Sequence, residues 1–214
     1  MKILNLYAGI GGNRKLCGCE HDITAVEYNA DIAAVYKDFY PNDTVIVGDA
    51  HEYLLKNYKE FDFIWASPPC QSHSQIRLCG QRKGICEPLY PDMKLWQEII
   101  FLEYYAKLSC KFVVENVRPY YKPFVKTTAE LGRHLFWSNF TIPFSDIKTD
   151  EIIGNISDGS TVFGINLKKY NMPSVKYKKQ ILRNMVNPEV GKYILDRAMD
   201  KPILIQGGLF EKLQ

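Results

Sequence analysis

The sequence predicts an α/β fold with a mostly parallel sheet whose faces are covered by helices. Strand-like and helix-like apolar patterns alternate along the first 115 residues, as βαβ units require. The first strand runs directly into a glycine-rich turn, the usual start of a nucleotide-type binding unit. The 214 residues are 46% hydrophobic and 24% charged, which is typical of one globular domain with a sizeable core.

Four strands are predicted in the first third of the chain, each from a short apolar run that ends in turn residues: 2–7, 23–27, 44–47 and 61–66. The first ends at the turn 8–12. A helix is predicted between the second and third strands, over 30–39, because apolar residues recur on one helical face, and Pro41 stops it.

Beyond residue 70 the pattern changes. Residues 71–91 lose periodicity and predict a long loop, which is usually functional or disordered. A helix is predicted over 92–108 with Asp92 as its N-cap, followed by a fifth strand over 111–115. Three later elements are predicted, two aromatic strand-like stretches and a final helix that has proline in its first turn: 134–140, 161–165 and 188–199.

The net charge of +3 conceals a division along the chain. Residues 20–62 carry ten acidic and three basic side chains, a net charge of −7, whereas the other residues carry +10. This asymmetry is expected when one region binds a cationic or neutral small ligand and another faces a polyanion. Solvated faces that differ in sign would give the same pattern, so charge alone leaves both interpretations open.

Candidate ligand-binding residues stand at the predicted carboxyl ends of strands, where open α/β sheets bind ligands. They are the glycine turn 9–12, Glu27, Asp49 and the segment 68–71. A glycine turn lets the backbone approach a ligand, and an acid after the second strand can accept hydrogen bonds from ribose hydroxyls. Together they favour an adenosine-containing cofactor. The turn lacks the Lys-Ser/Thr of a phosphate loop, and the acidic surroundings favour a sulfonium cofactor.

A thiol and a carboxylate follow neighbouring predicted strands. Cys70 comes directly after two prolines, whose stiff backbone would hold the thiol toward the cleft, and Glu115 ends the fifth strand beside Asn116. The pair suggests a nucleophile with a proton donor. By itself a Pro-Pro-Cys segment is as consistent with a structural cysteine. The six cysteines have no zinc spacing, so free thiols in a reducing compartment and no metal site are expected.

In this order, the motifs resemble those of the DNA cytosine-5 methyltransferases. The resemblance rests on Leu6-Tyr7-Ala8-Gly9-Ile10-Gly11-Gly12, Glu27, Gly48-Asp49, Ser67-Pro68-Pro69-Cys70-Gln71 and Glu115-Asn116-Val117. The segment 132–140 is similar to an Arg-His segment of short, phage-type members, and 183–188 to the family's last motif, with Arg183 in place of a glycine. The match covers most of residues 1–140 and roughly 180–200.

The resemblance implies a Rossmann-like S-adenosylmethionine-dependent methyltransferase fold, with helices on both faces of a mostly parallel sheet. It also implies a mechanism. Cys70 matches the thiolate that adds to C6 of a flipped-out cytosine, after which C5 takes the methyl group and S-adenosylhomocysteine is released. Glu115 matches the residue that holds or protonates N3, Asn116 would position Glu115, and Arg133 would contact the base or a phosphate.

The same resemblance implies a set of binding residues. The cofactor would be held by the glycine turn, by Glu27 at the ribose, by Asp49 at the adenine amino group, and by residues beside these motifs: Tyr7, Ala8, Gly9, Ile10, Gly11, Gly12, Tyr28, Ala50, Pro68, Asn184 and Val186. Trp65 and Ile10 fit an adenine contact and a core position equally well. DNA would be contacted by polar and basic residues of the loop and of a later basic stretch: Gln71, Ser74, Arg77, Arg82, Lys83, Lys168 and Lys169.

Two departures from the family pattern matter. Only Arg133 of the usual three Gln-x-Arg-x-Arg side chains is kept, because Leu131 and Leu135 stand at the other two positions. The target-recognition region is much reduced. We expect a catalytic domain of 1–140 plus 180–200, a small basic insertion at 141–179 and a tail at 201–214. Residues 159–188 contain no acid, which favours phosphate contacts, although a solvated basic hairpin remains an alternative.

The remaining expectations concern binding partners and cellular location. Gln206, Leu209 and Phe210 resemble a peptide that docks in the bacterial sliding clamp, and a plain packed or frayed end is the alternative. Without a long apolar run or a signal peptide, the chain is expected in the cytoplasm of a bacterium or a phage-infected host, away from membranes. Two other functions stay open: a weak or decayed DNA-binding homologue, and a tRNA cytosine-5 methyltransferase. The sequence leaves the oligomeric state undetermined.

Overall fold

The computed structural model describes residues 1–147 and 163–201. Its centre is a seven-stranded sheet in the order β3-β2-β1-β4-β5-β7-β6. The strands are β1 (Lys2–Leu6), β2 (Asp22–Glu27), β3 (Thr44–Val47), β4 (Phe63–Ala66), β5 (Lys111–Val117), β6 (Ala129–Leu131) and β7 (His134–Ser138). The first five are parallel, whereas β7 pairs antiparallel with β5 and β6 antiparallel with β7. The predicted α/β class with a mostly parallel sheet is confirmed.

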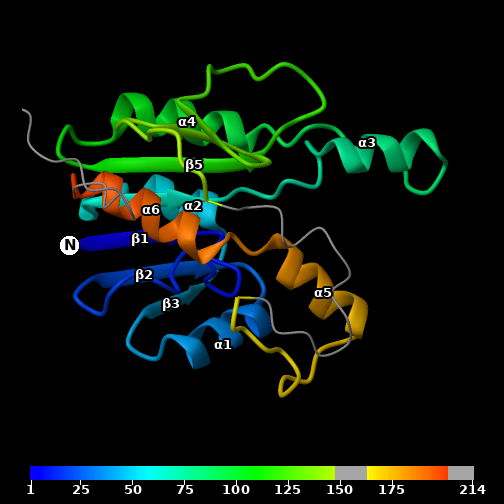
Figure 1. The fold of residues 1–214 in the computed structure, drawn as a ribbon, viewed down its shortest axis with the longest axis horizontal. Coiled ribbons are helices and arrows are strands. Elements are labelled where there is room, and N and C mark those ends of the chain that lie inside the picture. The colour runs from blue at the N-terminus through cyan, green and yellow to red at the C-terminus, as the bar shows by residue number, and fades with distance from the viewer. Residues whose placement is uncertain (148–162, 202–214) are drawn as a thin grey trace, which may run out of the picture.

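Helices cover both faces of this sheet (Figure 1). They are α1 (Ala30–Phe39), α2 (Ala50–Asn57), α3 (Gln75–Arg82), α4 (Lys94–Tyr105), α5 (Val175–Asn184) and α6 (Pro188–Ala198), with a 3-10 turn η1 (Tyr58–Glu60). On one face, α2 and α4 pack on residues such as Leu4 and Val114. On the other, α6 packs on their sequence neighbours Ile3 and Val113, as the alternation of side chains along a strand requires.

Three helices were absent from the sequence prediction: α2, α3 and α5. Residues 71–91 were predicted to be a loop, but they contain α3, which projects from the body of the molecule (Figure 1). None of the residues of α3 is buried, and most of them are polar or small. The helix begins at a cap in which Ser74 Oγ accepts a hydrogen bond from the amide of Arg77. Similarly, α2 is a short helix capped by Asp49, with only Ala50 and Leu54 buried.

The predicted helix over 92–108 corresponds to α4, which begins two residues later. Met93 holds the N-cap position, while the carboxylate of Asp92 accepts a hydrogen bond from the amide of Lys94 at 3.0 Å. The prediction that Asp92 caps this helix is therefore wrong by one residue. The final helix is α6, with Pro188 in its first turn and Asn187 as its cap.

The C-terminal third differs more from expectation. The stretch predicted over 134–140 forms β7, but residues 163–165 of the predicted strand 161–165 belong to no strand. Helix α5 crosses the expected boundary between 179 and 180. The clamp-like residues Gln206, Leu209 and Phe210 lie outside the described residues. Among residues 1–147 and 163–201, no helix has both the length and the apolar character needed to cross a membrane.

Candidate active site

The carboxyl ends of the central strands bring the predicted motifs together. The turn after β1, Glu27 at the end of β2, the segment after β4 and Glu115 in β5 all belong to the same edge of the sheet, because β1, β2, β4 and β5 are parallel neighbours. This edge is the usual ligand-binding edge of an open α/β sheet.

The glycine turn after β1 combines tight packing with one open position. A Cβ added to Gly11 would lie 2.4 Å from Tyr40 Cε2, and one added to Gly12 would lie 2.3 Å from the carbonyl oxygen of Val186. Gly9 has a φ of +55°, which favours glycine, and an added Cβ would meet nothing within 4 Å. The backbone at Gly9 therefore borders open space that a ligand can approach, whereas Gly11 and Gly12 serve close packing.

Glu27 is tied to this turn by its carboxylate. Its Oε2 accepts a hydrogen bond from the amide of Gly9 at 2.9 Å, and its Oε1 accepts one from the amide of Asn29 at 2.9 Å. Each carboxylate oxygen has a second lone pair, so Glu27 can still accept hydrogen bonds from a ribose diol. The neighbouring Tyr28, also predicted to bind cofactor, has an exposed side chain.

Asp49 has more partners than the sequence suggested. One oxygen caps α2 by accepting from the amide of His51 at 2.8 Å, and the other accepts from Lys94 Nζ at 3.0 Å. Burial raises the pKa of this carboxyl most, but the hydrogen bonds from Lys94 and from the α2 backbone together outweigh it and lower the pKa. A contact between Asp49 and an adenine amino group would thus be shared with Lys94.

A buried polar network behind the turn was missed by the sequence analysis. Glu98, on α4, is completely buried, and its Oε1 accepts hydrogen bonds from the Tyr7 hydroxyl and from His51 Nδ1, the latter at 2.9 Å. Burial raises the pKa of the Glu98 carboxyl, and the hydrogen bond to Glu98 raises the pKa of His51. The only available signal was a glutamate within an apolar helix pattern, and this cannot reveal partners 47 and 91 residues away.

The predicted nucleophile lies beside the predicted proton donor. Ala66 of β4 pairs with Val114 of β5, so the segment leading to Cys70 leaves the sheet next to Glu115. Burial, followed by the negative charge of Glu115, raises the pKa of the Cys70 thiol, while the charge of Arg133 acts in the opposite direction. Asn116 Nδ2 donates to the carbonyl of Pro68 at 2.9 Å and so ties β5 to the Cys70 segment.

The loop after Cys70 is anchored by two buried residues that the sequence analysis did not select. The amide of His73 donates to the carbonyl of Cys70 at 3.0 Å, and His73 Nδ1 lies 2.6 Å from the Tyr121 hydroxyl. Ser72 Oγ accepts from the amide of Asp92 at 2.9 Å. The backbone at Cys70 is thus fixed at the base of a loop whose outer part, α3, is exposed.

Arg133 and His134 approach the Cys70–Glu115 pair from the β6–β7 hairpin. Arg133 Nη2 donates to the carbonyl of Arg183, the penultimate residue of α5, at 3.0 Å. His134 Nε2 lies 3.5 Å from Glu115 Oε1, and the sequence analysis gave His134 no role. Leu131 and Leu135, which align with two arginines of the family pattern, are buried core residues.

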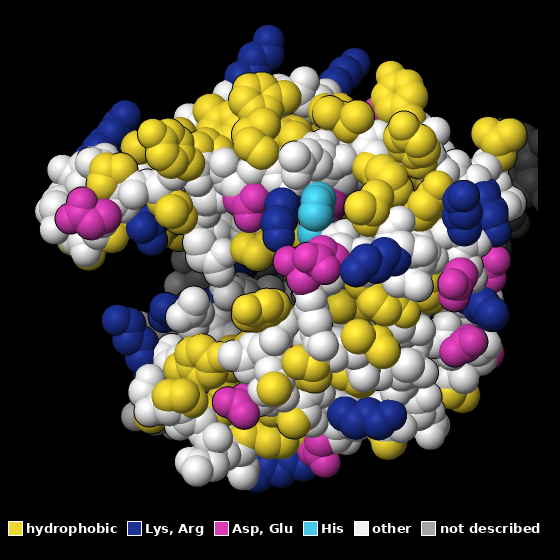
Figure 2. All heavy atoms as spheres, turned by 180° about the vertical axis from the view of Figure 1, so that it is seen from behind, with side chains coloured by type: hydrophobic (Ala, Val, Ile, Leu, Met, Phe, Trp, Pro, Cys, Tyr) yellow, Lys and Arg dark blue, Asp and Glu magenta, His cyan; other side chains and the backbone are white. Residues whose placement is uncertain are grey.

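The predicted substrate-binding residues divide into two groups. Arg77, Arg82 and Lys83 belong to the projecting α3 arm. Figure 2 shows this arm at the left, separated by a hollow from the lobe that contains α5, with Lys and Arg side chains on both sides. In contrast, Lys169 Nζ lies 2.6 Å from Asp38 of α1, so this lysine is held against the acidic half of the molecule.

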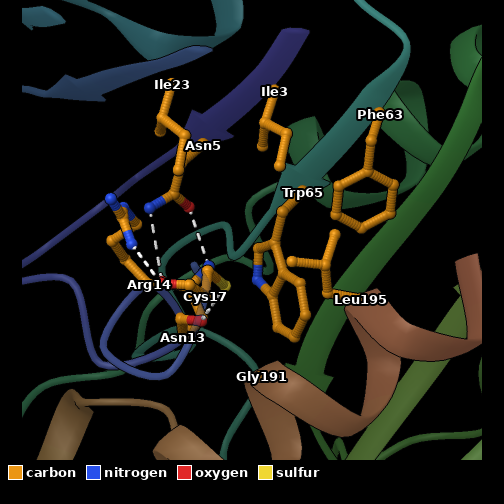
Figure 3. A pocket seen from close by; sticks show the side chains of 10 residues that line it. All are labelled: Ile3, Asn5, Asn13, Arg14, Cys17, Ile23, Phe63, Trp65, Gly191 and Leu195. Atoms are coloured by element: carbon orange, nitrogen blue, oxygen red, sulfur yellow. Dashed lines mark hydrogen bonds between the residues drawn. The ribbon is translucent and has the colours of Figure 1, made fainter. Parts of the chain in front are cut away.

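A small cavity below the glycine turn is not the cofactor site. It lies between β1, β4 and α6, with Asn13, Trp65 and Gly191 among its lining residues (Figure 3). Its volume of about 20 Å³ accommodates roughly one water molecule. Trp65 is buried here and donates to Ser67 Oγ at 2.8 Å, and Ile10 packs under α5, so both are core residues in this structure.

The fold and the site define a Rossmann-like α/β protein of the methyltransferase type, with a thiol–carboxyl pair beside a glycine turn. Residues 1–128, more than half of the chain, match the family model described as C-5 cytosine-specific DNA methylase. The chain belongs to this family, and the resemblance stated from its motifs is confirmed.

Solved structures provide a second comparison. The chain is similar to a protein described as a DNA modification methyltransferase encoded within an Escherichia coli prophage, with 20% identity, a TM-score of 0.37, and coverage of 57% of this chain and 33% of that one. It is also similar to an S-adenosylmethionine-dependent methyltransferase from Agrobacterium tumefaciens, with 12% identity, a TM-score of 0.42, and coverage of 56% and 40%. No curated protein matches. The chain spans less than half the length of either protein.

Proposed function

We propose that this protein is an S-adenosylmethionine-dependent DNA cytosine-5 methyltransferase that acts through a covalent bond between Cys70 and C6 of the base. The observation that carries the proposal is the meeting of Cys70 and Glu115 at the carboxyl ends of β4 and β5. This pair stands beside the glycine turn in a chain of the C-5 cytosine-specific family.

The chemistry requires two groups, because C5 of cytosine is a weak nucleophile. The Cys70 thiolate adds to C6 while the Glu115 carboxylic acid gives its proton to N3, so that C5 becomes enamine-like. When bound, S-adenosylmethionine supplies a methyl group on a positively charged sulfur. The C5 proton then leaves to a solvent base, the C6–S bond breaks, and N3 returns its proton to Glu115. Because the pKa of Cys70 is raised, thiolate formation depends on nearby positive charge, which Arg133 supplies.

The residues of the turn fit the cofactor. Gly9 borders open space, Glu27 keeps free lone pairs for ribose hydroxyls, and residues 20–62 carry a net charge of −7, which suits a sulfonium ligand without phosphates. Tyr7, Ala50 and Pro68 would form the walls around the adenosine. Asn184 and Val186 would close the methionine side, next to the position where Val186 contacts Gly12.

The DNA would lie in the hollow between the α3 arm and α5. Arg77, Arg82 and Lys83 belong to the α3 arm, and α5 carries exposed basic residues such as Lys176 and Arg183. Because C5 and C6 are enclosed in a duplex, the cytosine must be flipped out toward Cys70. Gln71 and Ser74, which precede α3 in the chain, would contact the displaced strand.

The test is methyl transfer from labelled S-adenosylmethionine to duplex DNA and, in parallel, to transfer RNA. Cys70→Ser should abolish transfer and leave cofactor affinity unchanged, whereas Cys19→Ser, which alters an exposed cysteine, should retain full activity. Sequencing of methylated cytosines would locate the product. Transfer by Cys70→Ser at the wild-type rate would refute the covalent mechanism, and transfer to RNA alone would refute the DNA assignment.

A further inference from the structure

Strand pairing explains why a histidine reaches the predicted proton donor. In the antiparallel pair β5–β7, Glu115 lies opposite Phe136, and Val117 lies opposite His134. Residues that face each other across such a pair share one face of the sheet, so His134 is a diagonal neighbour of Glu115, within reach of a long side chain. The observed separation of 3.5 Å between His134 Nε2 and Glu115 Oε1 agrees with this placement.

The pair is shielded from solvent. The side chain of His134 is 14% exposed and that of Glu115 is 8% exposed. The other ionisable groups whose charges act on this cluster are Cys70, from the loop after β4, and Arg133, from the hairpin turn. Among Cys70, Arg133 and His134, only His134 has an N–H that can donate to the Glu115 carboxyl without bringing a permanent charge.

We propose that His134 is a positioning residue, whose Nε2 holds the Glu115 carboxyl in the orientation from which it faces Cys70 and N3 of a flipped cytosine. The inference deepens the proposed function and rests on it. A carboxyl group has several rotamers, and the proton transfer to N3 requires one of them. A donor 3.5 Å away in the resting protein can shorten its contact when the base closes the site.

The protonation state of His134 suits this role. Burial lowers the pKa of His134 most, and the nearby charge of Arg133 acts in the same direction, while Glu115 opposes them. The imidazole is therefore neutral near pH 7. A neutral imidazole can donate one N–H to the Glu115 carboxyl and orient it without placing a full positive charge beside it.

The first test reads Cys70 directly and needs no activity. The rate of alkylation of Cys70 by iodoacetamide would be followed against pH by mass spectrometry of the tryptic peptide 60–77, which contains no other cysteine. Glu115→Gln removes a charge that raises the thiol pKa, so its midpoint should fall. His134→Ala should shift the midpoint in the same direction, because Glu115 is released, and His134→Gln should restore the wild-type midpoint.

The control is His21→Ala, which removes another histidine beside a glutamate, with His21 Nε2 3.4 Å from Glu20 Oε1 and no part in the proposed site. It should leave the Cys70 midpoint unchanged. A wild-type midpoint in His134→Ala would overturn the proposal. So would a shift of equal size in His21→Ala, since it would indicate a general loss of structure.

The second test separates positioning from binding. In His134→Ala the kcat for methyl transfer should fall on the order of 10²-fold, with KM for S-adenosylmethionine unchanged, and His134→Gln should recover most of the loss. An unchanged kcat, or a rise in KM alone, would contradict the positioning role. If the wild type transfers no methyl group to cytosine while the alkylation midpoints shift as expected, the proposed function fails and the His134–Glu115 contact stands.

Discussion

Gly191→Ala tests how the last helix supports the glycine turn. Gly191 is in α6, and a Cβ at this position would lie 2.5 Å from the carbonyl oxygen of Asn13, 2.6 Å from its Cα and 2.9 Å from its carbonyl carbon. All three are backbone atoms, so no side-chain rotation can relieve the overlap. Asn13 directly follows the turn, and reciprocal side-chain hydrogen bonds of 2.8 and 3.3 Å tie it to Asn5 of β1 (Figure 3).

The size of the effect follows from two opposing terms. Replacing glycine by alanine within a helix favours folding by about 1 kcal/mol through backbone entropy. To reach an ordinary contact distance, α6 would have to move by about 1 Å, and Val190, Ile194 and Leu195 would then lose packing against the sheet. Overpacking costs about 1–3 kcal/mol, and we place this overlap with backbone atoms in the upper part of that range, at about 2–3 kcal/mol. We expect net destabilisation of about 1–2 kcal/mol.

The assay is urea unfolding followed by circular dichroism, with S-adenosylmethionine affinity as the second measurement. With a slope of about 2 kcal/mol per M, the midpoint should fall by roughly 0.5–1 M. Affinity should also fall because the displaced residue borders the glycine turn. Gly80→Ala is the matched control: it lies within α3, and its Cβ would meet only the flexible Cys86 side chain at 3.3 Å. A midpoint for Gly191→Ala at or above that of the wild type would refute the reasoning.

Three further predictions concern charge and burial. The hydrogen bond to Glu98 raises the pKa of His51. The stability that protonated His51 adds is therefore complete below about pH 6.5 and is lost as the pH rises through the raised pKa. The urea midpoint of His51→Gln, measured across pH, should lack the decline that the wild type shows in this range. Replacing Lys176 and Arg183 of α5 together by glutamine should reduce the slope of log K for DNA binding against log salt by about 2, and Lys56→Gln, on α2, should not. Tyr36→Phe removes a buried hydrogen bond of 2.9 Å to Asp43 and should lower the free energy of unfolding by about 1 kcal/mol. Arg14→Ala, which removes the ion pair with the same Asp43, should lower it by more, and a cost for Tyr36→Phe equal to or larger than that for Arg14→Ala would contradict this ranking.

The sequence predicted the strands of the parallel core well because each is a short apolar run followed by turn residues, such as Gly48 after β3 and Pro68 after β4. The prediction failed for α3, whose residues are all at least partly exposed, and for α5, in which only Ile181 and Leu182 are buried. A helix with few apolar side chains is difficult to distinguish from a polar loop by sequence alone.

The candidate site shows the same division. Glycine, proline and cysteine at the ends of strands are local signals, so the glycine turn, Cys70 and Glu115 were found from their order along the chain. The roles assigned to them stay predictions. Partners brought by long-range pairing, such as Glu98 behind Tyr7 or Lys94 on Asp49, carry no local signal.

By itself, the sequence determined the α/β class, the family and the edge of the sheet where the chemistry is expected, because these depend on short motifs and on the alternation of elements. Only the tertiary structure decided which side chains lie on the same face of the sheet and within contact distance of one another. The antiparallel pairing of β7 with β5 places His134 rather than Leu135 toward Glu115, since a shift of one residue along a strand reverses the face.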